Sequence, residues 1–416
     1  MKVQGKYAEA TILTDVVDDT TLEQIKHVLD QPMFENEKIV IQPDCHAGKG
    51  CVIGFTSTYT DKIIPNLVGV DISCGMLWIK IGKNAIDLPK FDKMIREYIP
   101  AGNNAKEFRA TIRKSEFNLE NLRCYNGLHD TDWIMRSIGT LGGGNHFIEL
   151  DVDEYGDVYL VIHSGSRNLG KQVAEYYQDL ALKRLNKDRM ANAVRELVDR
   201  LKSEGRQSEI QVELKKMALP KFDKDLAYLE GEDLNDYIHD VELVAQYAKM
   251  NREEMAMNIL WYLTQGVVPV VNIFRDSDLV RFKDRFEFHH TVHNYIDAVN
   301  KIIRKGACSA TKDELLIIPI NMRDGSLICI GEGLEETNYS APHGAGRIMS
   351  RRQAKDNVSL EDYQKSMKGI YTTSVDTSTL DESPFAYKRL EDIERNLVGV
   401  RVLSRIKPIY NFKAGE

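Results

Sequence analysis

Apolar runs rich in β-branched residues alternate with glycines through the first third of the chain. This pattern is typical of short strands joined by tight turns, because glycine permits the backbone conformations that such turns need. It predicts strands over residues 38–42, 52–56, 67–70 and 77–81, and a further apolar run predicts one over 158–162. Apolar residues then recur at helical spacing from Val194 to Leu201, and residues 171 to about 265 are predicted to be mostly helical.

The pattern of the second half returns to strands. Strands are predicted over 267–273, 314–320 and 327–330, a helix over 389–397, and a last strand after Gly399. Strands on both sides of a long helical block indicate an α/β (α+β) fold, with central β-sheets and surrounding helices. The sequence has no internal repeat and no long linker. Residues 1–416 are therefore predicted to form one domain, with about 171–265 as a helical insertion or lobe within it.

Composition adds limits on compartment and partner. The chain of 416 residues carries a net charge of −8, which taken alone argues weakly against a nucleic-acid partner, although net charge says little about local patches. No apolar run approaches the roughly 18 residues of a membrane helix, and the first residues lack the apolar core of a signal peptide. We therefore expect a cytoplasmic protein without membrane association. Its six cysteines form no C-x-x-C pair and are expected to be free thiols.

Residues that can bind metals gather in a few glycine-rich segments. The segments are PDCHAGKG from Pro43, GVDISCG from Gly69, GGGNHFIE from Gly142, HSGSRNLG from His163, HHTVHN from His289 and HGAGR from His343. Seven of the ten histidines lie in them: His46, His146, His163, His289, His290, His293 and His343. Asp, Cys and His form a ligand set suited to zinc, manganese, iron or cobalt, whereas a thiolate disfavours calcium and magnesium.

Asp71 and Cys74 are three residues apart on a glycine-bounded turn, so both can face one ion. Taken singly, each has a structural explanation, because a buried cysteine is usually a packed small residue and an aspartate often caps a turn. The coincidence of five or six such residues beside glycines favours a joint metal site, and a thiolate is a good candidate to bridge two ions.

Two short segments bear on nucleotide chemistry. Residues 165–172 nearly match a GxxxxGK[ST] phosphate loop, but Gln172 lacks the hydroxyl that holds magnesium. Phosphate binding by backbone amides at a helix start stays open for this segment. The K-x-D-G motif of lysine-based nucleotidyl ligases is absent, since Met322 stands in the lysine position.

His343 is the alternative nucleophile. It lies in a loop of small residues that permits close approach of a phosphate, and Arg347, Arg351 and Arg352 follow on what is predicted to be the next helix. Guanidinium groups suit phosphate recognition. For Arg351 and Arg352, a solvated basic face is an equally good explanation.

Together these segments, with HNY, RKGA, MSRRQA and AYK, resemble the RtcB family of RNA ligases. They occur in family order from residue 43 to about 413, so the resemblance covers nearly the whole chain and implies an RtcB-type fold. It further implies a GTP- and manganese-dependent ligase that joins RNA 2′,3′-cyclic phosphate or 3′-phosphate ends to 5′-hydroxyl ends, in RNA repair or tRNA splicing. Whether an accessory protein takes part stays open.

The resemblance also implies roles for individual residues. Asp71, Cys74 and His146 would hold one Mn²⁺, and Cys74, His163 and His293 the second. His343 would attack the α-phosphate of GTP to give a covalent histidine–GMP, and Asp44 would orient or deprotonate a hydroxyl near the reacting ends. The positions that match guanylate-binding residues are Asn145, Glu149, Asn294, Ser326, Gly344, Ala345, Gly346, Tyr387 and Lys413.

Departures from the family pattern leave alternatives. His290 competes with His293 as the metal ligand, because the usual HHN run is interrupted here. Asn321 stands where many members have a serine beside the guanylate, and Ala47 and Lys49 replace bulkier residues, which is consistent with a divergent RNA-repair branch. Two other functions compete with ligation. One is a metal-dependent phosphohydrolase acting on cyclic phosphate ends, and the other is an inactive RNA-binding relative.

Overall fold

The computed structural model describes residues 1–106, 117–266 and 276–414. Within these ranges, thirteen strands form one large sheet, in the order β1-β2-β3-β4-β11-β10-β6-β8-β7-β15-β13-β12, with β14 paired to β11. The strands are β1 Lys2–Gln4, β2 Glu9–Ile12, β3 Ile39–His46, β4 Ile53–Thr58, β6 Gly75–Gly82, β7 Phe147–Val152, β8 Val158–Ser164, β10 His289–Asp297, β11 Ile302–Ser309, β12 Leu315–Asn321, β13 Gly325–Gly331, β14 Ser340–Pro342 and β15 Val400–Lys413. Neighbouring strands are antiparallel except β2 and β3.

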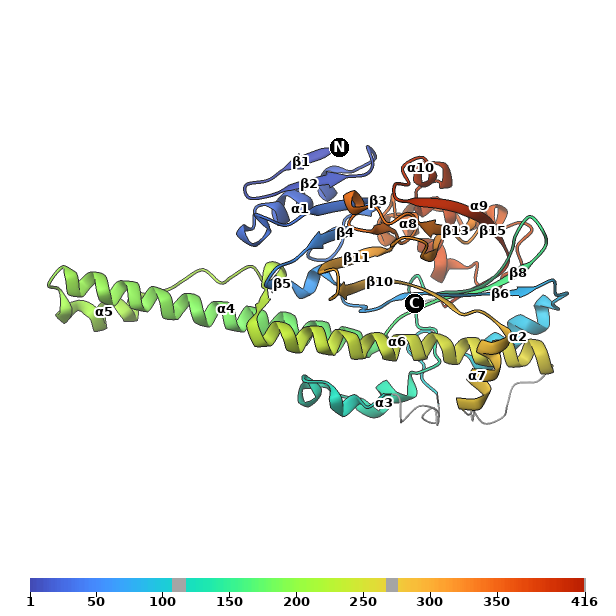
Figure 1. The fold of residues 1–416 in the computed structure, drawn as a ribbon, viewed down its shortest axis with the longest axis horizontal. Helices are drawn as coiled ribbons and strands as arrows, with labels where there is room; N and C mark the ends of the chain where they lie inside the picture. Colours follow the sequence, from blue (N-terminus) through green and yellow to red (C-terminus); the bar gives the residue numbers. More distant parts are fainter. Residues whose placement is uncertain (107–116, 267–275, 415–416) are drawn as a thin grey trace.

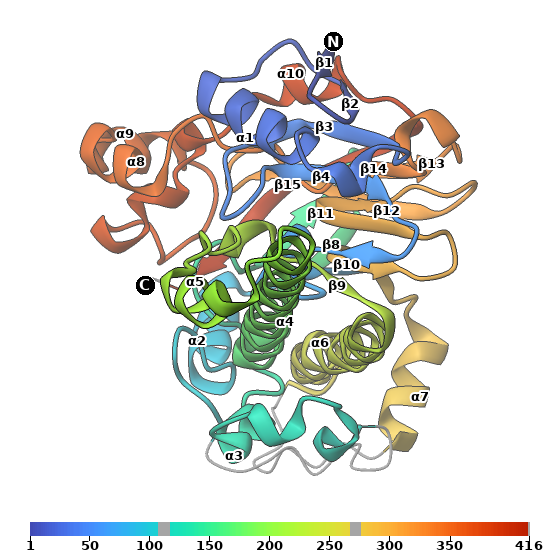
Figure 2. The same cartoon turned by 90° about the vertical axis from the view of Figure 1, so that its left-hand side faces the viewer.

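The helices lie on both sides of this sheet (Figures 1 and 2). They are α1 Asp19–Leu29, α2 Leu88–Tyr98, α3 Thr131–Arg136, α4 Arg167–Ser203, α5 Ile210–Lys216, α6 Gly231–Gln265, α7 Asp276–Arg285, α8 Arg351–Asn357, α9 Leu360–Ser366 and α10 Leu390–Glu394. A small second sheet pairs β5 Lys62–Ile63 with β9 Leu229–Glu230. In the described part of the chain, no helix combines the length and the apolar character that a membrane crossing needs.

Two long helices, α4 and α6, run side by side beneath the strands (Figures 1 and 2). The 37 residues of α4 correspond to about 55 Å of helix, and its second half projects from the body together with α5 (Figure 1). Buried α4 residues such as Val173 and Tyr177 join one core with the first part of α6. The second part of α6, around Met255 and Ile259, packs under β6, β7 and β8 in a separate core.

The predicted mixture of helices and strands is confirmed, and most predicted strands coincide with β3, β4, β6, β8, β12, β13 and β15. Helix dominates residues 171–265, but a 3₁₀ turn, Lys224–Leu226, and β9 interrupt it between α5 and α6. The helix predicted over 389–397 is shorter, and the strand predicted over 267–273 lies outside the described residues.

The strand predicted over 67–70 is wrong. The chain forms a 3₁₀ turn, Pro65–Leu67, and then a bend at Gly69 with φ of +98°. Proline has no backbone N–H to give to a ladder, and this positive φ is incompatible with a strand. Leu67 and Val68 are buried in the core nonetheless, which explains why the apolar run looks like a strand.

Candidate metal centre and adjoining cavity

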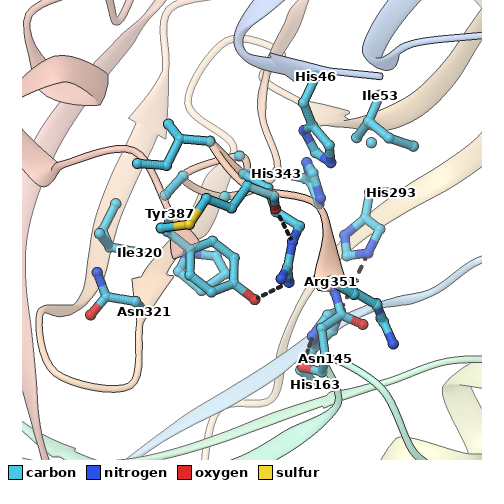
Figure 3. Close-up of a pocket in the computed structure, with 18 of the residues that line it drawn as sticks. His46, Ile53, Asn145, His163, His293, Ile320, Asn321, His343, Arg351 and Tyr387 are labelled. Atoms are coloured by element: carbon cyan, nitrogen blue, oxygen red, sulfur yellow. Dashed lines mark hydrogen bonds between the residues drawn. The ribbon is translucent and has the colours of Figure 1, made fainter. Parts of the chain in front are cut away.

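A cavity of about 830 Å³ lies within the body of the protein. His343 lies between His46 and His293 there, and Tyr387 lies on the side of Ile320 and Asn321 (Figure 3). Most of the site residues predicted from the sequence line the cavity: Asp71, Cys74, Asn145, Glu149, His163, His293, Asn294, His343, Gly344, Ala345, Gly346, Tyr387 and Lys413. Asp44, His146 and Ser326 do not line it.

Neighbouring strands bring the metal-binding side chains together. Cys74 immediately precedes β6, His163 lies in β8, His146 precedes β7, and His293 lies in β10. These four strands are consecutive in the sheet, in the order β10-β6-β8-β7. Residues that are distant in sequence therefore meet at one end of adjacent strands.

Two groups of three ligands share the sulfur of Cys74. The Sγ atom lies 3.4 Å from Nε2 of His146 and 3.3 Å from Nε2 of His163. Nε2 of His146 is 3.2 Å from Oδ2 of Asp71, and Nε2 of His163 is 3.3 Å from Nε2 of His293. Within each group, Asp71–Cys74–His146 and Cys74–His163–His293, the ligand atoms lie within 4.8 Å of one another. These are the two sets that the sequence predicted, and metal binding by them stays a prediction.

Backbone carbonyls orient the imidazole rings toward this centre. Nδ1 of His146 donates to the carbonyl of Leu141 at 2.8 Å, and Nδ1 of His163 to that of Asn145 at 3.2 Å. Because a carbonyl only accepts, Nδ1 carries a proton, and Nε2 is the ring nitrogen that faces the shared sulfur. Such partners on the far nitrogen are typical of metal-binding histidines.

Burial keeps the histidines of the second group neutral. It lowers the pKa of His163 and of His293 well below the usual value, and neighbouring histidines add to the effect. Burial, together with the charge of Asp71, raises the pKa of the Cys74 thiol well above its usual value. A bound cation reverses the preference of the thiol, because a coordinated thiol loses its proton. The donors therefore suit an ion of the zinc, manganese or cobalt class.

The carboxylate of Asp71 occupies the start of α4. Its Oδ1 accepts hydrogen bonds from the backbone N and the hydroxyl of Ser166, at 3.1 and 3.2 Å. A Cβ atom at Gly165 would lie 2.3 Å from this oxygen, so the close approach requires glycine. Burial alone would raise the pKa of Asp71, but the hydrogen bond and charge of His146 lower it to about 2. One amide of the segment considered for phosphate binding, the backbone N of Ser166, thus already binds a side chain.

His290 and His293 point to opposite sides of β10. Successive side chains alternate across a strand, and His290 lies with Nε2 3.5 Å from Glu253 of α6. His293 instead reaches the ligand cluster, and its ring lies 4.7 Å from that of His343. The structure therefore places His293, not His290, with the other ligands.

His343 is held by a buried carboxylate. Its Nδ1 lies 2.6 Å from Oδ2 of Asp44, which also accepts from the His343 backbone N at 3.1 Å. Asp44 is fully buried and contacts this ring, and its predicted action on a hydroxyl stays a prediction. A Cβ atom at Gly346, which has φ of +73°, would lie 2.0 Å from the Asp44 carbonyl oxygen. With Nδ1 engaged, Nε2 is the ring nitrogen free for chemistry.

Glu382, which the sequence did not single out, anchors the far wall of the cavity. It accepts from Nζ of Lys413 at 2.8 Å, from the Tyr387 hydroxyl at 2.5 Å and from Nη1 of Arg347 at 3.2 Å. Burial alone would raise its pKa, but Lys413 and Arg347 lower it to about 2. It is therefore a carboxylate that fixes three cavity-lining side chains. No motif surrounds it that would have identified it.

The remaining predicted positions differ in their surroundings. Burial raises the pKa of Glu149 to about 7, although Lys413 and Asn411 act against this rise. The amide of Asn294 pairs with the carbonyl of Asp71 and the backbone N of Gly306, so it is already occupied. Ser326 is buried in β13, and its Oγ has no hydrogen-bond partner among the residues that the structure describes.

Of the arginines predicted on the helix after His343, only two are helical. Ser350 caps α8, which begins at Arg351. Arg347 precedes it and lies over the ring of Tyr387.

Comparison with known proteins gives consistent matches along the chain. A sequence profile of the family described as tRNA-splicing ligase RtcB matches residues 24–136 and 126–414. The chain is 31% identical over 387 residues to the RNA-splicing ligase RtcB of Escherichia coli K12, with 86% of each chain covered. It is 30% identical to RNA-splicing ligase RtcB1 of E. coli ATCC 25922, with the same coverage. It is 23% identical over 484 residues to the tRNA-splicing ligase RtcB of Nanoarchaeum equitans, with 97% of this chain and 93% of that one covered.

Proposed function

Because the chain belongs to the RtcB family of RNA ligases, we propose that it joins RNA 3′-phosphate or 2′,3′-cyclic phosphate ends to 5′-hydroxyl ends, using GTP and two manganese ions. One observation carries this proposal. The ring of His343 lies beside His293 at the edge of two ligand groups that share Cys74. A candidate nucleophile thus lies next to a candidate site for cations, an arrangement that suits phosphoryl chemistry at a nucleotide.

In this proposal, Nε2 of His343 attacks the α-phosphorus of GTP. An N–P bond forms, the P–O bond to the β-phosphate breaks, and pyrophosphate leaves. The guanylate then passes to an oxygen of the RNA 3′-phosphate, and attack by the 5′-hydroxyl releases GMP and seals the strand. A cyclic end must first be opened by water, because guanylate transfer needs a free 3′-phosphate. Asp44 holds the tautomer with Nε2 unprotonated and stabilises the positive charge that develops on the ring.

The two ligand groups are proposed to hold one ion each, with Cys74 between them. Ions there would neutralise negative charge at the reacting phosphates. On the opposite wall, Lys413, Tyr387 and Arg347 are held by Glu382, which supports their use in binding the guanylate. Asn145 and Glu149 also line the cavity, as do the small residues of the Gly344–Gly346 loop.

A nicked RNA with 3′-phosphate and 5′-hydroxyl ends tests the proposal. Incubated with the protein, manganese and GTP, it is expected to give sealed product, and none when GTP is replaced by ATP. Product analysis separates the competing functions. Loss of the phosphate or opening of a cyclic end without sealing identifies a phosphohydrolase. RNA that is bound and recovered unchanged identifies an inactive binding protein, and either result contradicts ligation.

The affinity for guanosine is expected to rise with pH through about 7. Burial raises the pKa of Glu149 to about 7, so below that pH its carboxyl is largely protonated and cannot accept both guanine N–H groups. Each pH unit below 7 is then expected to weaken binding by up to about tenfold. Guanosine, which has no phosphate to titrate, is measured by calorimetry without metal between pH 5.5 and 8.5.

Glu149→Gln is the matched control for this measurement, because it keeps the shape of the side chain and removes the titrating group. Its guanosine affinity is expected to be low and independent of pH. A wild-type affinity for guanosine that does not change between pH 6 and 8 would contradict the proposal that Glu149 binds the guanine.

A further inference from the structure

Four consecutive polar residues are buried in the middle of α6. Asn251, Arg252, Glu253 and Glu254 are each at most 5% exposed, in a helix whose neighbouring residues Met250 and Met255–Met257 are apolar. Burying such groups is costly unless each finds a partner. None of the four lines the cavity, so their partners must account for their presence.

Asn251 joins the segments that carry two of the predicted ligands. Its Oδ1 accepts from the backbone N of Gly139 and of Thr140, at 2.8 and 3.0 Å. Its Nδ2 donates to Oγ of Ser164 and to the carbonyl of Gly165, both at 3.0 Å. The first pair precedes His146 in the chain, and the second follows His163 directly.

Ser164 carries this connection on to a ligand. Its hydroxyl donates to the carbonyl of Leu141 at 2.8 Å, and Nδ1 of His146 donates to the same carbonyl at 2.8 Å. Asn251 is thus two hydrogen bonds away from the atom that orients His146. Displacing Asn251 would release both the loop before β7 and the end of β8.

Arg252 ties the third segment to the second. Its Nη1 donates to the carbonyl of Ser73 at 3.0 Å and to that of Ser164 at 2.9 Å. Ser73 precedes Cys74 and adopts a left-handed φ of +58°, a conformation that serine rarely takes without support. The guanidinium therefore holds the turn of Cys74 against the segment of His163.

We propose that Asn251 and Arg252 are positioning residues of the metal centre, which hold the three ligand-bearing segments in register and thereby set the affinity for the ions. The inference rests on the metal centre of the proposed function. Groups that orient ligands without touching the metal typically change metal affinity by 10–100-fold when they are replaced. Asn251 and Arg252 do not contact the ligand side chains themselves; they bind the backbone of the segments that carry them.

The test is a cobalt titration of the full chain, read from the thiolate-to-cobalt absorption band. Asn251→Leu and Arg252→Met are expected to weaken cobalt binding by about 10–100-fold and to alter the band. Asn258→Leu is the matched control, because Asn258 is also fully buried in α6 but its amide donates to the carbonyl of Glu254 within the same helix. It is expected to keep the wild-type affinity, while circular dichroism follows folding in all three.

The conservative variants Asn251→Asp and Arg252→Lys keep the result decisive if the larger changes prevent folding. Arg252→Lys retains the charge and a nitrogen that can donate to both carbonyls, but that nitrogen lies one bond nearer the backbone than Nη1, and an intermediate affinity is expected. Wild-type affinity in all Asn251 and Arg252 variants overturns the inference, as does an equal loss in Asn258→Leu. A wild-type chain that binds no cobalt contradicts the metal centre itself.

Discussion

His343→Ala is expected to abolish covalent labelling of the protein by GTP, with a loss of ligation of at least about 1,000-fold. The alanine has no nitrogen to form the N–P bond. Of the other histidines that line the cavity, His163 and His293 face the ligand cluster through Nε2, and Nδ1 of His46 lies 3.0 Å from the Asp44 carbonyl. The measurement is acid-labile radiolabel transferred from GTP labelled at the α-phosphate, in the presence of manganese.

His290→Ala is the control for this prediction. His290 is a half-buried histidine on the same sheet, but it contacts Glu253 and lies away from the ligand cluster. It is expected to keep labelling and ligation. Label that persists in His343→Ala would show that another residue is the nucleophile. A complete loss of labelling in His290→Ala would contradict the choice of His293 as the metal ligand.

Local sequence carried most of the information about the ligands. A cysteine or histidine beside glycines at a strand end can be recognised from a few neighbouring residues, and Asp71, Cys74, His146 and His163 all occur in such segments. The choice between His290 and His293 needed one more fact, which is that residues 289–297 form a strand. Had that strand been predicted, the alternation of side chains would have separated the two histidines.

Residues that act through distant partners could not be predicted in this way. Arg252 contacts Ser73 across 179 positions of sequence, and Asp44 contacts His343 across 299. Nothing near Asp44 in the sequence indicates that its carboxylate lies under a histidine, and its predicted role on an RNA hydroxyl came from the family resemblance. The role of Glu382 likewise becomes visible only in the folded chain, where it contacts Lys413 and Arg347.

Burial also misleads when it is read as secondary structure. Leu67 and Val68 are fully buried, and their apolar character made residues 67–70 look like a strand. A buried turn needs the same side chains, and the nearby Pro65 and Gly69 were the local signals against a ladder. The long helices were easier, because helical spacing persists over many turns.

Cys74→Ser is expected to remove both ions together and to lower ligation by more than about 100-fold. The sulfur belongs to both ligand groups, whereas His146 and His293 each belong to one. Mass spectrometry of the metal content should therefore give a loss at both sites for Cys74→Ser. His146→Ala and His293→Ala should each lose one ion more readily than the other.

The comparison of these three variants is what tests a shared ligand. If the two groups bound their ions independently, Cys74→Ser would lower the metal affinity no more than the summed effects of removing one histidine from each group. A bridging thiolate neutralises repulsion between two cations, so its loss should weaken both sites by more than that sum. Serine keeps the size of the side chain but is a poor ligand while its hydroxyl is protonated. Retention of one ion at wild-type affinity in Cys74→Ser would contradict a shared ligand, because that site would then not depend on the sulfur.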